Sequence, residues 1–258
     1  MGTMHIPALH ILDDIKGLQF ALNSSEAIVT EMAASIRTEE TRKKYSYLLY
    51  LPDSISYSGL LSEEEYETLD SALKSILSKG LDELGNLNPS TLYSRVCGTM
   101  LYEIEPKLLN YDKSIDTYIQ EFGKEMGMPL LGLESPEDMV SYENRAMSTE
   151  EYAKFLVQSL RSPDKIKETR TKMYESYRAG DMTALYNTVF INPDYGNDLI
   201  SESEMNINKI RNDKWIAQLP ALMEKHSCFI AVGGAHLGGK DGLINQLREL
   251  NYKVEPVK

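Results

Sequence analysis

Two histidines, one near each end of the chain, stand in the same local setting. His5 ends the run GTMH (residues 2–5) and His236 ends the run GGAH (residues 233–236), so each reads Gly-x-x-His. The chain has only four histidines among 258 residues, which makes a matched pair informative. Glycine lets the backbone turn sharply and leaves room for a ligand, and histidine is the commonest protein metal ligand. If both turns end strands of one sheet, the two imidazoles are expected to meet in space.

Two glutamates end apolar runs that read as strands. Glu31 lies in the run 27–32, and Glu134 ends the run 128–134. In α/β sheets, ligands bind beyond the carboxyl ends of the strands, so a functional role is favoured for Glu31. For Glu134 a salt bridge or a helix-capping role competes, because a capped helix is expected to begin at Ser135.

Two histidines and one carboxylate suit a divalent metal ion that keeps an open position for water. Such an ion lowers the pKa of its water towards neutrality and polarises a carbonyl group. The reaction class that follows is metal-assisted hydrolysis. The sequence contains no His-Glu-x-x-His helix, so it is not an ordinary zincin.

The glycine-rich segment 234–241 offers a rival interpretation as a phosphate-binding loop. It fits G-x-x-x-x-G-K, but Asp241 stands where that loop needs a Ser or Thr hydroxyl. Nucleotide binding is therefore disfavoured, and Asp241 is predicted to be the N-cap of the last helix.

A basic and an aromatic residue lie one turn apart just before the strand expected at 228–232. Arg211 and Trp215 share one face of a predicted helix, and Asn212 follows Arg211 directly. A solvated charge beside an aromatic ring explains this pair as well as a site role does.

Composition excludes two classes of partner. The formal net charge of −12 repels phosphate backbones, so nucleic-acid binding is not expected. No apolar run approaches the roughly 18 residues of a membrane-spanning helix, so no transmembrane segment is expected. Cys97 and Cys228 lack metal-ligand spacing and are expected to be small buried residues.

Strands are few, apolar and separated by helical stretches, which favours an α/β fold with a mostly parallel central sheet made of two half-units. Strands are expected at 27–32, 128–134, 228–232 and 253–257. Helices are expected at 9–22, 114–125 and 241–250, after capping boxes at Ser62 and Ser148, and from Ser135. One domain over 1–258 is expected, with helical insertions at about 50–110 and 145–225. The second insertion, with its loop 193–198, is expected to form a mobile cap.

The first Gly-x-x-His turn begins at residue 2, whereas such a turn normally needs a strand to deliver it. We expect that strand to be encoded upstream, behind a signal or lipid-anchor segment. The protein would then be extracytoplasmic, either periplasmic or lipid-anchored.

Nearly the whole chain resembles the TraB/GumN family, whose relatives include the Tiki proteases and the pheromone-shutdown protein PrgY. The strongest match is the closing part of the chain, and single pieces elsewhere support it. The matching runs are RNDKW (211–215), AVGGAHLGGKDGLINQLRELNYKVEPV (231–257), GTMH (2–5), VTE (29–31), SIDTYI (114–119), GMPLLGLES (127–135) and YRAGD (177–181).

The resemblance implies a bacterial protein with a compact α/β core, a helical insertion and a site built from both Gly-x-x-His turns. The Tiki branch implies metal-dependent proteolysis, with manganese, cobalt or zinc as the ion and a peptide or small molecule as the substrate. A PrgY-like protein that sequesters a peptide or partner without catalysis is the alternative. Carried over to this chain, the resemblance makes His5, Glu31 and His236 the metal and catalytic set, joined by Arg211. It makes Glu134, Asn212, Gly2, Gly233 and Gly234 the groups that support the ligands or contact substrate.

Overall fold

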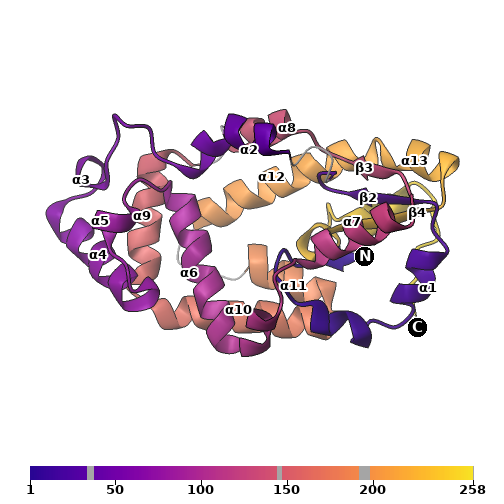
Figure 1. Ribbon diagram of the computed structural model, residues 1–258, viewed down its shortest axis with the longest axis horizontal. Coiled ribbons are helices and arrows are strands. Elements are labelled where there is room, and N and C mark those ends of the chain that lie inside the picture. Colours follow the sequence, from indigo (N-terminus) through magenta and orange to yellow (C-terminus); the bar gives the residue numbers. More distant parts are fainter. Residues whose placement is uncertain (34–37, 144–146, 192–197, 258) are drawn as a thin grey trace.

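The centre of the protein is a four-stranded sheet in which every strand pair is parallel. The computed structural model describes residues 1–33, 38–143, 147–191 and 198–257. The strand order is β1-β4-β2-β3 (Figure 1). The strands are β1 (Gly2–Thr3), β2 (Ala27–Thr30), β3 (Leu130–Gly132) and β4 (Cys228–Gly233). The predicted α/β fold with a mostly parallel sheet is confirmed.

Helices make up most of the remaining described chain. Up to β3 they are η1 (Leu9–Asp14), α1 (Leu18–Asn23), α2 (Glu39–Lys44), η3 (Ser46–Leu49), α3 (Tyr57–Leu60), α4 (Glu63–Leu77), α5 (Leu81–Leu84), α6 (Pro89–Ile104), η4 (Pro106–Asn110) and α7 (Ile115–Glu125). After β3 they are α8 (Pro136–Glu143), α9 (Thr149–Leu160), α10 (Pro163–Arg178), α11 (Met182–Phe190), α12 (Asp198–Ile216), α13 (Leu219–Lys225), η6 (Gly234–His236) and α14 (Leu243–Glu249). Within these ranges, no helix is long and apolar enough to cross a membrane.

The sheet is covered on both faces, because successive residues of its strands point into different cores. Ile28 of β2 packs in one core with Ile119 of α7, whereas Val29 packs in another with Trp215 of α12. β2 is buried along its whole length, as expected for a central strand of a parallel sheet. The apolar run at 27–30 is therefore explained by burial on both sides.

A third core lies away from the sheet and is built by helices alone. Leu69 and Leu73 of α4, Leu92 of α6 and Leu156 of α9 are fully buried in it. Figure 1 shows these helices at the opposite end of the molecule from the sheet, with α10 and α12 running between the two ends. The protein is thus elongated, with the sheet at one end and a helical bundle at the other.

The capping boxes begin their helices where the sequence predicts. The Ser62 hydroxyl accepts from the Glu65 backbone N–H while the Glu65 carboxylate accepts from the Ser62 backbone, at the start of α4. Ser148 and Glu151 do the same for α9. Each pair satisfies two backbone donors that the first turn of a helix leaves without partners.

Two predictions for the C-terminal region are wrong. Residues 253–257 form no strand: the Arg248 side chain donates to the Val254 carbonyl oxygen, and Val257 packs against Gly17. Asp241 is not an N-cap: Gly242 is the N-cap of α14, and the Asp241 carbonyl oxygen accepts from the Asn212 side chain.

The expected helix at 9–22 is interrupted. It forms as η1 and α1, separated by Gly17, which adopts a left-handed conformation with φ of 70°. Most of the loop predicted at 193–198 lies outside the described residues.

Candidate functional site

Four side chains that follow the four strands meet at one edge of the sheet. His5 follows β1, Glu31 follows β2, Glu134 follows β3 and His236 follows β4. Because all four strands are parallel, their carboxyl ends lie at the same edge. The structure thus brings together residues that are up to 231 positions apart in the sequence.

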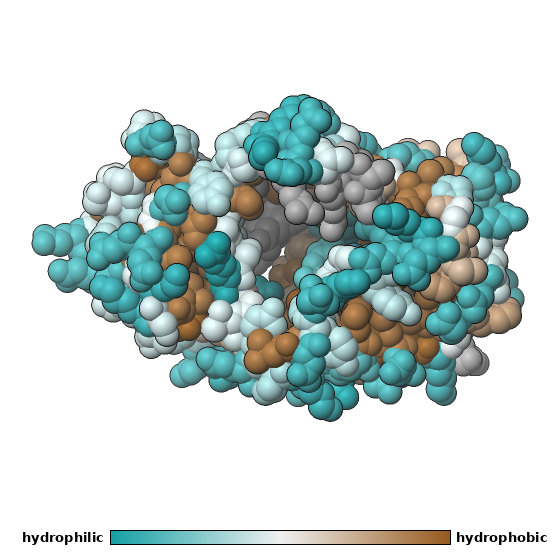
Figure 2. All heavy atoms as spheres, in the orientation of Figure 1, coloured by the Kyte–Doolittle hydropathy of each residue, from teal (hydrophilic) through white to brown (hydrophobic). Residues whose placement is uncertain are grey.

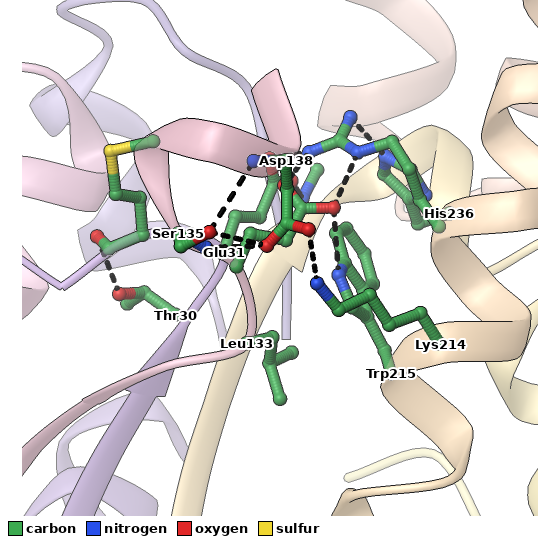
Figure 3. Close-up of polar contacts among 12 residues, drawn as sticks. Thr30, Glu31, Leu133, Ser135, Asp138, Lys214, Trp215 and His236 are labelled. Carbon is green, nitrogen blue, oxygen red and sulfur yellow. Dashed lines mark hydrogen bonds and ion pairs between the residues drawn. The ribbon is translucent and has the colours of Figure 1, made fainter. Parts of the chain in front are cut away.

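Arg211 of α12 ties three of these side chains together. Its Nε and Nη2 donate to the two carboxylate oxygens of Glu134 at 2.9 and 2.8 Å, a bidentate pair. Nη2 also donates to Glu31 at 2.7 Å, and Nη1 lies 3.1 Å from His236 Nε2. Figure 3 shows Glu31 and His236 directed towards this shared centre. Arg211 is therefore part of the site's hydrogen-bond network rather than a solvated charge.

Glu134 is the most deeply buried carboxylate of the centre. Its side chain is 1% exposed, and Trp215 Nε1 donates to it at 2.9 Å alongside Arg211. Of its two competing roles, the salt bridge is present, with Arg211, whereas the helix-capping role does not apply, since Ser135 and Asp138 cap α8 between themselves. A buried carboxylate without partners is costly, so Glu134 and Arg211 fix each other in place.

The imidazole of His236 is neutral and held in one orientation. Its Nδ1 lies 2.8 Å from Asn212 Oδ1, while Asn212 Nδ2 donates to the carbonyl oxygens of His236 and Asp241. An amide oxygen only accepts, so Nδ1 carries the hydrogen and Nε2 carries the lone pair. Burial and then the positive charge of Arg211 lower the pKa of His236 to about 3. Its ring also contacts Trp215, with ring centroids 4.3 Å apart.

The imidazole of His5 is oriented by a residue that the sequence analysis missed. Asp116, in the first turn of α7, accepts from His5 Nδ1 at 2.9 Å and from the Thr3 hydroxyl at 2.7 Å. The hydrogen bond to Asp116 raises the pKa of His5. Asp116 is 4% exposed and lies beside Ile115 and Ile119 on the buried face of its helix. A carboxylate on an apolar helix face is the signal that could have identified it.

Glu31 is a stable anion. Burial disfavours its charge, but Arg211, the histidines and the Gly233 backbone N–H together outweigh that effect and hold the pKa of Glu31 at about 2. Its Oε1 accepts from the Gly233 backbone N–H at 2.7 Å and lies 3.7 Å from His5 Nε2. Glu31 therefore links the two Gly-x-x-His turns.

The glycines of the two turns allow this close approach. A Cβ atom on Gly233 would lie 3.1 Å from Glu31 Oε1 and 3.5 Å from both His5 Nε2 and the His236 ring. A Cβ on Gly2 would lie 2.9 Å from the Cα atom of Gly234. The three side chains thus approach one another above Gly233, where a Cβ would crowd the Glu31 carboxylate and stand between the donor atoms.

The site opens into a cavity of about 660 Å³, called here the central cavity. His5, Arg211 and His236 line one end of it, and apolar side chains such as Leu101 of α6 and Phe190 of α11 line much of the rest. Figure 2 shows a hollow with hydrophobic side chains near the middle of this face. Its volume falls in the range of small-molecule and peptide pockets.

The imidazole and carboxylate groups of the site are of the types that bind divalent metal ions, but they do not surround a common point as ligands would. Within the described ranges, no three His, Cys, Asp or Glu side chains stand close enough to hold an ion as they lie. Arg211 lies among these donor groups, and its guanidinium contacts His236 Nε2 and Glu31.

A family model described as the TraB/PrgY/gumN family matches residues 1–256 of the chain. Neither the curated proteins nor the solved structures gave a match.

Proposed function

The chain belongs to the TraB/PrgY/gumN family, and from its site we propose that the protein is a metal-dependent hydrolase that acts on peptides. The observation that best supports this proposal is that both Gly-x-x-His imidazoles are held by a hydrogen bond at Nδ1. His5 gives its Nδ1 hydrogen to Asp116 and His236 gives its own to Asn212, so each ring in its neutral form offers an Nε2 lone pair. Metal-ligating histidines almost always have such a partner on the other ring nitrogen.

The residues that would hold a divalent ion are His5, Glu31 and His236. When bound, the ion would supply an activated water at neutral pH and polarise the substrate carbonyl. Manganese, cobalt and zinc all suit a site of imidazole and carboxylate ligands. Arg211 competes for the His236 lone pair, so His236 serves as a ligand only when Arg211 releases it.

The protein groups contribute position and charge. Glu31 stays ionised and His236 stays neutral throughout the physiological pH range, because their pKa values are about 2 and about 3. Arg211 lines the central cavity and carries the positive charge that can stabilise a developing oxyanion. In the reaction, the water oxygen bonds to the carbonyl carbon, the C–N bond breaks, and the amine leaves with a proton from that water.

A second candidate function is sequestration of a peptide without cleavage. One observation favours it: Arg211 already hydrogen-bonds Glu31, Glu134 and His236, so these three side chains have a partner without an ion. The central cavity would then be a binding pocket only.

A cleavage assay separates the two functions. We would measure hydrolysis of a fluorogenic peptide mixture with manganese, cobalt or zinc, for the wild type, His5→Gln and His236→Gln. His226→Gln is the matched control, because His226 ends α13 and does not line the central cavity. Each site variant is expected to lose roughly 100-fold or more in rate, and the control is expected to keep the wild-type rate.

Two results would overturn the proposal. If both site variants cleave at the wild-type rate, the two histidines have no role in catalysis. Tight peptide binding by the wild type, with no cleavage under any of the three ions, would establish sequestration instead.

A further inference from the structure

A second cavity opens beside the central one, against helix α6. This outer cavity has a volume of about 880 Å³, and its lining includes Leu49, Tyr50 and Met139. These three side chains remain 51%, 43% and 41% exposed, respectively. Large apolar side chains that gather at the surface of a protein mark interaction sites. The outer cavity therefore has the character of a binding surface.

The two cavities meet at Ser94 of α6, which lines both. Ser90 lines the outer cavity and Gly98 lines the central one, and the three residues are spaced four apart on one helix face. The space above Gly98 is open, since no heavy atom lies within 4 Å of a Cβ built there. From Ser90 to Gly98 the helix rises about 12 Å, the length of roughly three to four extended residues.

Both cavities border the proposed reacting centre. Met32, which follows Glu31 directly, lines the outer cavity. Gly233, whose backbone N–H donates to Glu31, lines the central cavity. A chain that occupies both cavities would therefore run from the residue that follows Glu31 to the residue whose backbone N–H binds the Glu31 carboxylate, with apolar side chains at both ends of its path.

We infer that the substrate is an extended polypeptide segment that occupies both cavities, with apolar side chains on each side of the bond that is cleaved. A single small molecule would fill the central cavity and leave the outer one, with its exposed Leu49 and Tyr50, unused. The inference rests on the proposed hydrolase for the reaction, but its test is binding and needs no cleavage.

The test measures how affinity depends on peptide length. Peptides of alternating leucine and serine, three, six or nine residues long, would be acetylated, amidated and labelled with fluorescein. Their binding to the wild-type protein would be followed by fluorescence anisotropy with EDTA present, so that no cleavage occurs. The nine-residue peptide is expected to bind at least about tenfold more tightly than the three-residue one, because it buries additional apolar side chains.

Two variants locate the effect. Leu49→Ser is expected to lower the ratio of the two affinities by roughly threefold or more, since one leucine contact is lost. Leu109→Ser is the matched control: Leu109 is 68% exposed in η4, lines neither cavity, and should keep the wild-type ratio.

Equal affinity for all three lengths, or an unchanged ratio in Leu49→Ser, would overturn the inference. So would a dimer that dissociates in Leu49→Ser, as seen by sedimentation, because the outer cavity would then be covered by a second copy of the chain. Failure of the hydrolase proposal is seen separately, as absence of cleavage with any ion while the length dependence of binding persists.

Discussion

Replacing Glu134 by glutamine removes one charge from the buried centre while keeping the shape of the side chain. Glu134 is 1% exposed at its side chain and binds Arg211 through both oxygens. Removing one partner of a buried ion pair costs about 3–5 kcal/mol. The glutamine oxygen can still accept a hydrogen bond from Trp215, and Arg211 still pairs with Glu31. We therefore expect the loss of unfolding free energy to lie at the low end of this range, about 3 kcal/mol. At roughly 2–4 °C per kcal/mol for a chain of this size, the melting temperature should fall by about 6–12 °C.

Urea unfolding at neutral pH measures this loss. It can be followed by circular dichroism and by the fluorescence of Trp215, the only tryptophan, which is fully buried and bonded to Glu134. Glu137→Gln is the matched control three residues further along the chain, in α8: its side chain is 66% exposed, so the change should stay within about 0.5 kcal/mol. In the double variant of Glu134→Gln with Arg211→Met, the loss should be smaller than the sum of the single losses by about 1 kcal/mol or more. If Glu134→Gln behaves like the control, or if the two losses simply add, the account of a coupled buried pair is incorrect.

Three further predictions concern the same centre. Asp116→Asn should reduce catalytic efficiency by roughly 10- to 100-fold, because His5 loses the charged acceptor that orients it; peptide hydrolysis measures this, and an unchanged rate would contradict it. Gly233→Ala should abolish most activity with little change in melting temperature, since its Cβ would stand between the donor atoms. Gly59→Ala should keep both, because Gly59 lines neither cavity and its Cβ would make only an ordinary contact with Ser56, at 3.6 Å. The pKa of about 3 for His236 means that the unfolded chain takes up its proton first. Stability should therefore fall as the pH drops below about 6.5, by up to about 1.4 kcal/mol per pH unit, and His236→Gln should flatten that slope between pH 6.5 and 4.5 in urea titrations.

The convergence of the strand ends could be predicted because it follows from topology alone. Apolar runs identify buried strands, and parallel strands place their carboxyl ends at one edge. Glu31, His5 and His236 could therefore be placed near one another without knowing any distance. The same local pattern failed at residues 253–257, because alternation of apolar residues does not reveal whether a sheet edge is free to pair.

The contacts made by helices could not be predicted in the same way. Arg211 reaches Glu134 across 77 positions and Glu31 across 180, and no spacing in the sequence links them. Its two interpretations, solvated charge and site residue, differ only in how α12 docks on the sheet. Asp116 was missed for a related reason: its role depends on the side of α7 that faces β1, which the sequence does not fix.

The separation of the hydrophobic cores bears on how relatives of this protein can diverge. The strand ends rest on the two cores of the sheet, whereas Leu69 and Leu156 belong to the helical core. Helix α6 belongs to both, with Val96 in the helical core and Leu101 in a sheet core. Substitutions that repack the helical core can tilt or shift the outer part of α6 while the chemistry at the strand ends stays fixed. Selection for a new ligand can therefore act on one end of the molecule without rebuilding the other.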